Sequence, residues 1–529
     1  MRTLACFVLL LVLPASAALA QAKTRRLPGI INHPSLNLYS PYISHDGNAL
    51  LFISDNGEDG ALALFYTSRE NDWTEPVAVP KNVFHRLTFL RGFGLSADGK
   101  KIFYTSTKSP IVGGYDIVFS ELKGTSWTEP LNLMLPVNTK TNEGCPSISA
   151  DGNTLYFMRC DKMDQNKADG CKLFVTKKKP NGQWDEPKEL PANINTGNSQ
   201  APRIMADDET LIFSSNKMAS TKGGMDLYES RLVNGTWSDP VPLDFVNSDK
   251  DDQYVGVAAL GRYLLKEAPG PRKNSEIVEF LFPNELRPKG MMKIEGKITD
   301  AANAPTAAYI DIMDVVSNKR VYSARPAADG SYMVYLREGT RYQFSVDPEQ
   351  SNNSYFTKVF DLTSDKTPQK EKVNVVLKQP VAGDEFALDF VAFKPNSSTL
   401  DPTSQTELKK LVRMAKANPQ VKFEIQVMLK GYQQDSLKSD PDLTEVTIDS
   451  VMRQVSDIDS LGKAYKKDTL VARTIYHNDR TQAQAKQIVD YLKLQGLDPA
   501  SLTSFVNAIP VTPGEPKKLT IKVAVRPKQ

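Results

Sequence analysis

The sequence predicts a multidomain protein that is mainly β for most of its length and α/β at its C-terminus. Three observations support this fold class. One phrase recurs at a nearly constant spacing between residues 40 and 269, which indicates a repeat architecture. Alternating strand patterns with frequent turn residues follow over 292–378. From about residue 384, helical and strand patterns alternate.

The first twenty residues have the pattern of a secretory signal peptide. Arg2 supplies the basic start, an apolar run covers 4–13, and Ala18 and Ala20 form a small-x-small cleavage site. The apolar run is too short to span a bilayer. We therefore expect residues 1–20 to be removed, and we expect no transmembrane segment in the mature chain.

Charge and cysteine content restrict the classes of function. The 65 Lys and Arg residues nearly balance the 62 Asp and Glu residues, so the net charge of +3 gives no case for a nucleic-acid partner. An exported protein permits disulfides, and three cysteines remain after cleavage: Cys145, Cys160 and Cys171. Because three is odd, at least one thiol is free or pairs between chains.

The repeated phrase predicts a β-propeller. It reads SPYISHDGNALLFISD (40–55), GFGLSADGKKIFYTST (92–107), CPSISADGNTLYFMRC (145–160) and APRIMADDETLIFSSN (201–216), with a worn copy at 254–269. The turn positions Gly47, Gly99, Gly152, Asp208 and Gly261 are separated by 52, 53, 56 and 53 residues. Each Asp-Gly suits a tight hairpin in which both central residues have φ > 0. Four short strands, repeated five times, predict a five-bladed propeller over residues 21–288.

The four tryptophans mark one place in four of these units. Trp73, Trp127, Trp184 and Trp237 open the phrases WTEP, WTEP, WDEP and WSDP. We interpret them as blade-packing residues at the start of the outer strand, and a platform for a sugar ring is the alternative. The last unit has no Trp, but LPGIIN (27–32) echoes LPVNTK (135–140) and LPANIN (190–195). We therefore expect a strand near 27–32 to join the last blade and close the ring, which removes an exposed edge.

The cysteine positions predict one disulfide. Cys160 ends the second strand of the third unit and Cys171 begins its third strand. These ends face each other in an antiparallel hairpin, at a distance that a disulfide can bridge. We expect Cys160 and Cys171 to be bonded and Cys145 to stay free.

The combination of SxDG, GG[YM]D (113–116 and 223–226) and W-x-[ED]-P resembles the PD40 repeat, a WD40-like propeller repeat also found in the TolB family. The resemblance covers about 27–288. Residues 289–380 contain GKITD (296–300), DGSY (329–332) and GTRY (339–342), and predict a small β-sandwich that resembles the carboxypeptidase regulatory-like domain. That resemblance implies a spacer or binding module.

Residues 381–529 resemble the OmpA-like domain, with an insertion at 433–478. The order is a strand and loop from 386, a helix over 403–419, a strand over 421–431, a helix over 481–498 and a last strand over 517–527. The resemblance implies binding of peptidoglycan in Gram-negative envelopes. The three regions together resemble an envelope architecture of the Bacteroidota, including periplasmic proteins associated with type IX secretion.

The peptidoglycan pocket that the resemblance implies has lost its charges. The family binds diaminopimelate with an Asp and an Arg. The Asp carboxylate binds the ammonium group of the ligand, and the Arg guanidinium fork binds the carboxylate of the ligand. Here Gly431 and Tyr432 precede Gln434 at the Asp position, and Gln484 stands at the Arg position. A register slip of one would restore Asp435. We expect peptidoglycan binding to be weak or lost.

The insertion carries a possible modification pattern. Asp-[Ser/Thr]-apolar resembles the O-glycosylation sequon of exported Bacteroidota proteins, and it predicts glycans at Ser436, Ser450, Ser460 and Thr469. The alternative is that these Asp and Ser residues cap short helices.

The sequence offers no supported catalytic residue, metal ligand or cofactor site. It has no G-x-S-x-G nucleophile elbow, and none of its four histidines has zinc-ligand spacing. The acidic runs at 161–170 and 249–252 lack the calcium-loop pattern. We therefore expect a non-enzymatic scaffold of the periplasm, associated with the outer membrane or cell wall, whose propeller binds an envelope protein. The alternative is an exported glycan-binding or glycan-processing protein that uses the propeller mouth.

Overall fold

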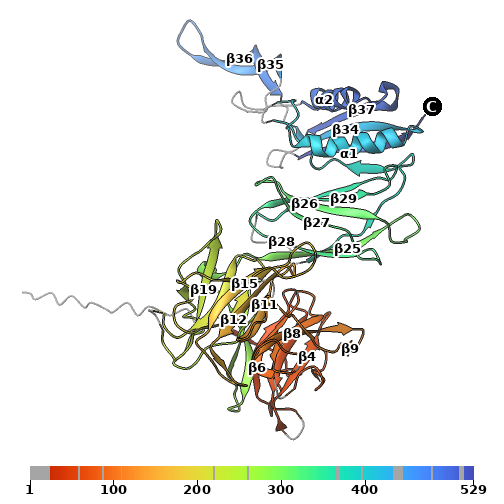
Figure 1. The fold of residues 1–529 in the computed structure, drawn as a ribbon. Helices are drawn as coiled ribbons and strands as arrows, with labels where there is room; N and C mark the ends of the chain where they lie inside the picture. The colour runs from red at the N-terminus through yellow and green to blue at the C-terminus, as the bar shows by residue number, and fades with distance from the viewer. Residues whose placement is uncertain are drawn as a thin grey trace, which may run out of the picture. The chain divides into compact units, whose positions relative to one another are not determined.

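The computed structural model describes residues 24–57, 60–85, 88–108, 110–218, 221–258, 261–363, 370–394, 397–432, 445–477, 480–510 and 518–528. The chain divides into two compact units, Met1–Met292 and Lys293–Gln529 (Figure 1). The predicted signal peptide lies outside the described residues. Of the helices in the described part, none is long and apolar enough to cross a membrane.

The first unit consists of antiparallel sheets that follow the sequence repeat. The first sheet holds β2 (Leu38–Ile43), β3 (Ala49–Ser54), β4 (Ala63–Ser68) and β5 (Val77–Ala78). The second holds β6 (Thr88–Leu95), β7 (Lys101–Ser106), β8 (Asp116–Lys123), β9 (Ser126–Trp127) and β10 (Leu131–Asn132). The third holds β11 (Asn142–Ile148), β12 (Thr154–Cys160), β15 (Lys172–Lys177) and β16 (Lys188–Glu189).

The fourth sheet holds β17 (Ser199–Ile204), β18 (Thr210–Ser215), β19 (Asp226–Val233), β20 (Thr236–Trp237) and β21 (Val241–Pro242). The fifth holds β22 (Gly256–Ala258), β23 (Tyr263–Pro269), β24 (Ser275–Leu281) and, as its outer strand, β1 (Thr24–Arg26). The first strands of the sheets contact one another in the order β22, β2, β6, β11, β17. Arg203 of β17 then reaches Val255, next to β22, so the sheets form a ring. This topology is a β-propeller.

Apolar clusters fill the space between successive sheets, and the tryptophans belong to them. Trp73, which lies between β4 and β5 of the first sheet, packs with Leu265 and Ile277 of the fifth sheet. Trp127 meets Tyr66 of the preceding sheet edge-on, with ring centroids 5.4 Å apart. Trp184 and Trp237 pack in the same way, the former in the cluster with Phe103 and the latter against Tyr156. Each Trp therefore joins its own sheet to the one before it.

The Asp-Gly turns differ from the expected geometry. Gly47, Gly99 and Gly152 have φ of 73°, 69° and 73°, but the preceding aspartates do not have positive φ. In the first turn, Ser44 Oγ donates to Asp46 Oδ1 at 2.6 Å and accepts from Ala49 N at 2.9 Å. The Ser and Asp of SxDG thus hold the turn by side-chain bonds, so one left-handed glycine is enough. The expectation of two positive φ values was wrong.

The N-terminal segment joins the fifth sheet, but three residues earlier than predicted. β1 pairs with β24 in the register Arg25–Glu279, whereas residues 27–32 form a turn after the strand. Asn32 then donates Nδ2–H to Ile277 O and accepts from Ile277 N, both at 2.9 Å. Asn138, Asn195 and Asn247 bond the third strands of their sheets in the same way. The similarity of LPGIIN to the later segments therefore reflects this pair of asparagine hydrogen bonds, which we call the asparagine clamp. The strand that pairs with β24 is β1, which precedes the clamp.

The second unit begins with a two-sheet β-sandwich. One sheet holds β28 (Ser331–Arg337), β25 (Met291–Thr299), β31 (Lys370–Lys372) and β32 (Val375–Val376). The other holds β27 (Lys319–Ala324), β26 (Ala308–Asp314), β29 (Arg341–Pro348) and β30 (Phe356–Asp361). Phe344 is fully buried and stacks on Tyr332 of the facing sheet at 5.7 Å.

An α/β region follows in the same unit. Its sheet has the order β33 (Glu385–Ala387), β38 (Lys518–Pro527), β34 (Val421–Tyr432), β37 (Leu502–Pro510), and α1 (Ser404–Ala417) and α2 (Thr481–Leu494) pack on it (Figure 1). β37 is absent from the predicted elements. Asp347 of the sandwich binds Lys410 at 2.6 Å and Arg413 at 3.1 Å, which ties α1 to the sandwich.

The insertion forms a long hairpin. β35 (Glu445–Ile458) pairs with β36 (Ala464–His477) in a two-stranded sheet. Ser450 and Thr469 lie on these strands and Ser460 lies at the connecting turn, and all three are exposed. The alternative that these residues cap short helices is therefore wrong for them. Ser436 lies outside the described residues.

Candidate functional site: the mouth of the propeller

The first strands of the propeller carry a repeated backbone feature. Ser40, Cys145, Ala201 and Tyr254 have φ of 51°, 48°, 48° and 51°, and the first three lie at β-bulges in their strands. Non-glycine residues with such φ are uncommon and cluster at functional or tightly constrained positions. Each of them opens one copy of the repeated phrase. The residue just before each copy therefore occupies an equivalent place at one end of the ring.

A cavity of about 580 Å³ opens at this end. Side-chain amides and charged groups line much of it. The lining residues are Arg91, Asn166, Lys167, Ala168, Asn198, Gln200, Asn216, Gly224, Met225, Asp251, Gln253, Tyr254 and Glu267. They come from the second to the fifth sheets and from the loop between β12 and β15. We call this cavity the mouth.

Arg91 is held in the mouth by neighbours from two other sheets. Its guanidinium carbon lies 5.6 Å from the ring centre of Tyr39 and 5.9 Å from that of Tyr254. Glu267 approaches to 3.9 Å and also accepts from Ser40 N at 3.2 Å. Burial raises the pKa of both tyrosines, so their rings remain neutral and present π faces to the cation.

A second arginine crosses the centre of the ring. Arg203 is buried, and it donates to Val255 O at 3.0 Å, Pro202 O at 3.1 Å and Phe93 O at 3.2 Å. Its guanidinium lies 4.5 Å from the ring centre of Tyr42. Burial lowers the pKa of Arg203, because desolvation disfavours its charge. One side chain thus bonds three sheets through carbonyl oxygens and a π face.

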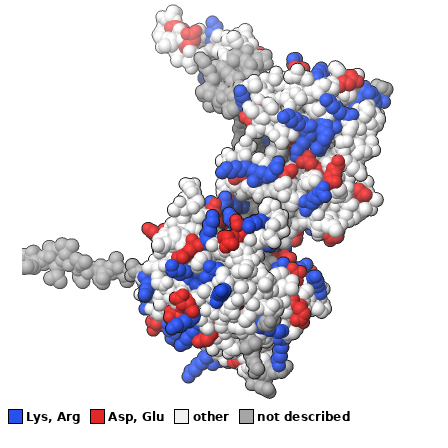
Figure 2. Space-filling model, in the orientation of Figure 1, with Lys and Arg blue, Asp and Glu red and all other residues white. Residues whose placement is uncertain are grey.

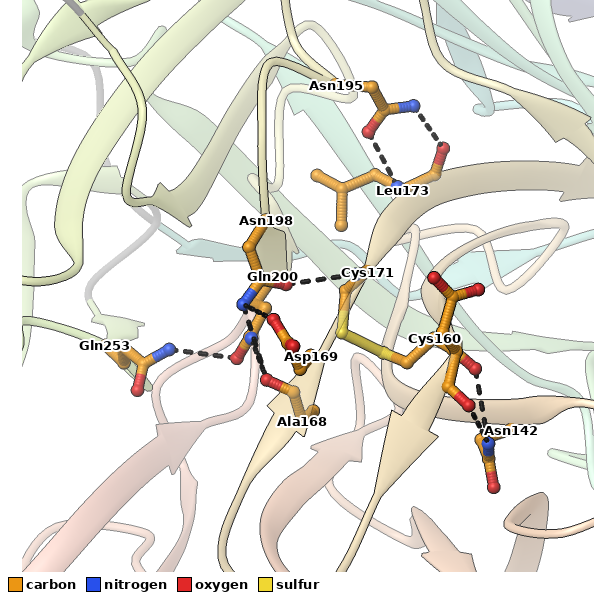
Figure 3. The surroundings of a disulfide bond; sticks show 11 residues. Asn142, Cys160, Ala168, Asp169, Cys171, Leu173, Asn195, Asn198, Gln200 and Gln253 are labelled. Carbon is orange, nitrogen blue, oxygen red and sulfur yellow. Dashed lines mark hydrogen bonds between the residues drawn. A yellow bond between two sulfur atoms is a disulfide. The ribbon is translucent and has the colours of Figure 1, made fainter.

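The disulfide loop forms one wall of the mouth. Cys160 and Cys171 are bonded, and Cys145 is a free, buried thiol whose pKa burial raises to about 12. The loop contains a small hairpin of β13 (Lys162–Met163) and β14 (Ala168–Asp169). Gln200 Nε2 donates to Ala168 O at 2.6 Å and Gln253 Nε2 donates to Gln200 Oε1 at 3.0 Å (Figure 3).

The loop also reaches the second sheet. Leu90 N donates to Gln165 O at 3.1 Å. Asn198 accepts from Cys171 N at 3.0 Å, as Figure 3 shows. The loop is therefore fixed to the sheets on both sides of its own. The cysteine positions predict the disulfide but give no indication that the loop it closes lines the mouth.

The mouth residues Arg91, Gln200 and Gln253 were not predicted, although the sequence contained a signal. Each stands immediately before one copy of the repeated phrase, as does Tyr39 before the first copy. In a ring of equivalent sheets, equivalent positions lie at one height around the axis. Three of the five positions that precede the phrases therefore line the mouth, Tyr39 contacts Arg91 beside it, and the fifth position is Gly144, which has no side chain.

The predicted peptidoglycan positions are only partly described. Tyr432 ends β34 and pairs with Pro510, and Gln484 is buried in the first turn of α2. Gln434 and Asp435 lie outside the described residues. The degenerate peptidoglycan pocket therefore stays a prediction.

Within the described ranges, no group of three or more His, Cys, Asp and Glu side chains could hold a metal ion. His45 illustrates the histidine environment. Its Nε2–H donates to Ile148 O at 3.1 Å, and burial lowers its pKa, so it is a neutral core residue that joins two sheets. Basic and acidic side chains are interspersed on the face of the first unit that Figure 2 shows.

No family model matches the chain, and no curated protein matches it. Among solved structures, it is similar to a putative TolB from Agrobacterium tumefaciens, with 16% identity over 56% of this chain and 90% of the other, and a TM-score of 0.29. TolB from Acinetobacter baumannii is 12% identical over 46% of this chain and 54% of the other, with a TM-score of 0.29. An arabinanase from Bacillus subtilis is 13% identical over 46% and 94%, with a TM-score of 0.32. These neighbours include proteins with and without an enzyme name, and their low similarity favours neither class.

Proposed function

We propose that this protein is a non-enzymatic scaffold of the periplasm, associated with the outer membrane or cell wall. Residues 21–288 are its five-bladed propeller, and the mouth binds an envelope protein. The resemblances to PD40, regulatory-like and OmpA-like domains support a place in a type IX secretion complex or a related envelope complex of the Bacteroidota. The alternative is a glycan-binding or glycan-processing protein that uses the same mouth.

The location of the tryptophans favours a protein partner over a glycan. Sugar sites commonly use exposed aromatic faces, but Trp73 and Trp184 are buried between sheets and Trp127 and Trp237 pack against Tyr66 and Tyr156. At the mouth, Arg91 covers the ring faces of Tyr39 and Tyr254. The mouth therefore offers amides and charged groups rather than a stacking platform. Such groups suit the polar edges and charged side chains of a polypeptide.

The two carboxylates of the mouth are engaged in the fold. Glu267 accepts from Ser40 N and faces Arg91, and Asp251 accepts from Met225 N at 2.9 Å. A glycosidase needs two carboxyl groups free to act as acid and base or nucleophile. These contacts support a binding role for the mouth.

Site-specific crosslinking in the envelope tests this proposal. A photo-reactive amino acid at Asn216, which lines the mouth, should crosslink to a defined envelope protein. The same amino acid at Lys188, on the outer strand β16, serves as the control because it is exposed and does not line the mouth. Equal products from both sites, or secretion of the protein into the medium, would favour the alternative.

The C-terminal region is proposed to bind peptidoglycan weakly or not at all. Both charged anchors of the family are replaced by amides, and charge-assisted hydrogen bonds of this kind contribute about 1.5–3 kcal/mol each. Sedimentation of the full chain with purified sacculi should leave it in the supernatant. Pelleting that free diaminopimelate reverses would show that Asp435 serves as the anchor after a shift of one residue.

A further inference from the structure

The carboxylates of the mouth are engaged by hydrogen bonds within the fold to a greater extent than its cations. On the acceptor side, Glu267 is engaged by Ser40 and Arg91, and Gln200 Oε1 accepts from Gln253. Asn198 Oδ1 accepts from Cys171 N, and Asn216 Oδ1 accepts from Asn198 N at 3.2 Å. Asp251 uses one carboxylate oxygen for Met225 N.

The cationic donors are less engaged. Within the described residues, the guanidinium of Arg91 donates no hydrogen bond and meets its nearest carboxylate, Glu267, only at 3.9 Å. Its cation–π contacts with Tyr39 and Tyr254, at 5.6 and 5.9 Å from the ring centres, do not use its N–H groups. The side chain of Lys167, on the disulfide loop, is exposed and forms no ion pair with a described carboxylate.

The buried cation adds to this imbalance. All three described hydrogen bonds of Arg203 go to neutral carbonyl oxygens, and no carboxylate among the placed residues forms an ion pair with it. Arg203 donates to Val255 O, and Val255 follows Tyr254, which lines the mouth and whose ring lies 5.9 Å from the guanidinium of Arg91, so both cations lie near the same part of the cavity. In a site with low dielectric, such fixed charges attract an anionic ligand more strongly than they would in water.

We propose that the mouth binds an acidic polypeptide segment, with Arg91 and Lys167 as the residues that contact its carboxylates. The guanidinium fork and the ammonium line the same cavity, and Leu90 N, next to Arg91, bonds Gln165 O, two residues before Lys167, so the two cations suit two acidic side chains of one segment. Asp251 keeps one oxygen free and opposes this ligand. The inference deepens the proposed function, because it specifies the chemistry of the protein partner at the same site.

A binding titration with the full mature chain tests the proposal. The probe is a fluorescein-labelled peptide of alternating Glu and Gly, and a peptide of alternating Lys and Gly is the opposite-charge control. Lys167→Gln should weaken binding of the acidic peptide by about two- to fivefold at low ionic strength, as expected for an exposed ion pair. Lys162→Gln is the matched control, because Lys162 is exposed on the same loop and does not line the mouth.

Two further variants sharpen the test. Arg91→Gln should weaken binding by about tenfold or more, because its pair is partly desolvated. Asp251→Asn should strengthen binding, because it removes the opposing charge while its Oδ1 can still accept from Met225 N. If Arg91→Gln fails to fold, the Lys167 and Asp251 variants still decide the outcome.

The proposal is overturned if the acidic peptide does not bind, if the basic peptide binds as tightly, or if Lys162→Gln weakens binding as much as Lys167→Gln. The result is separable from the proposed function. If Asn216 crosslinks to an envelope protein while the acidic peptide does not bind, the scaffold role stands and the acidic ligand is excluded. If both experiments fail, both proposals fall.

Discussion

Individual residues hold the propeller together across its sheet boundaries. Each Trp packs on the sheet before its own, and Arg203 bonds carbonyl groups of three sheets. The sequence alone leaves the role of each Trp ambiguous, because a Trp buried between sheets and a Trp that binds a sugar are the same residue type. Their partners decide between the two interpretations.

Truncation of one inter-sheet Trp should destabilise the propeller. Trp184→Ala removes a side chain that is 8% exposed and packs in the cluster with Phe103 and Phe157. We expect the free energy of unfolding to fall by about 3 kcal/mol, the low end of the cost for truncating a buried Trp. Urea unfolding followed by far-UV circular dichroism measures this. Trp184→Phe should recover most of the loss, and equal effects of both variants would argue against a packing role.

Glu407 should make stability depend on pH. It is fully buried in α1 and accepts from Thr357 Oγ1 at 2.6 Å and Phe390 N at 2.7 Å. Desolvation raises the pKa of its carboxyl group from 4.5 to about 7, with Asp389 adding to the rise and Lys410 opposing it. The protonated form is therefore favoured in the folded state. The stabilisation from this protonated group is complete below about pH 4.5 and is lost as the pH rises through about 7. The free energy of unfolding changes by up to about 3 kcal/mol over this range.

Glu407→Gln isolates this effect. Thr357 and Phe390 bond different carboxylate oxygens, so the amide oxygen of the variant can accept from Phe390 N while its Nε2–H donates to Thr357 Oγ1, and the variant cannot ionise. We expect the stability of the variant relative to the wild type to increase between pH 4.5 and 7.5, measured from urea midpoints of the full chain. A difference that is constant over this range would show that the carboxyl group titrates normally.

At the scale of elements, the N-terminal segment completes the ring. β1 pairs with β24, Asn32 clamps Ile277, and Leu27 and Ile31 join the cluster between the fifth and first sheets. This arrangement uses the terminus to cover the edge of β24, which would otherwise be open to pairing with another chain.

Deletion of residues 21–34 should therefore lower the thermal midpoint by about 10 °C. The estimate follows from the loss of two buried apolar side chains, at about 1.5–3 kcal/mol each, in a unit of this size. Deletion of residues 21–23 alone is the control, because it leaves β1 intact. A midpoint that is unchanged after the longer deletion would exclude closure by this segment.

The hairpin of β35 and β36 presents the predicted modification sites. Ser450, Ser460 and Thr469 are exposed, and backbone pairing leaves their side chains outside the sheet. We propose that they carry O-linked glycans in the native host. The intact mass of the native protein should exceed the mass of the bare mature chain. Each of the variants Ser450→Ala, Ser460→Ala and Thr469→Ala should lack the mass of one glycan. A native mass equal to that of the bare chain would exclude the modification.

At the scale of the whole molecule, the mouth depends on the ring. Its residues come from positions about one repeat apart, and the disulfide loop of one sheet reaches the sheets on both sides. A ligand at the mouth would therefore contact most of the propeller at once. Binding should accordingly stabilise this unit against unfolding, by a free energy that increases with the logarithm of the ligand concentration above Kd.

The sequence by itself determined the repeat period, the order of the strands within each repeat and the disulfide pair. These features are local or repeat regularly, so strand patterns and spacing are enough to predict them. The alternation of helices and strands after residue 384 likewise predicted α1, α2 and most of their sheet, although β37 was missed.

Only the tertiary structure decided how distant residues meet. The pairing strand at 24–26 rather than 27–32, the crossing of Arg203 to Val255 and Phe93, and the return of the disulfide loop to Leu90 all depend on closure of the ring. Arg91, Gln200 and Gln253 share a site because equivalent positions of successive sheets converge near one axis. The physical reason lies in the range of the interactions. A strand pattern in the sequence specifies only the hairpin in which it occurs. The arrangement of the sheets in a ring is fixed by the burial of apolar faces between them.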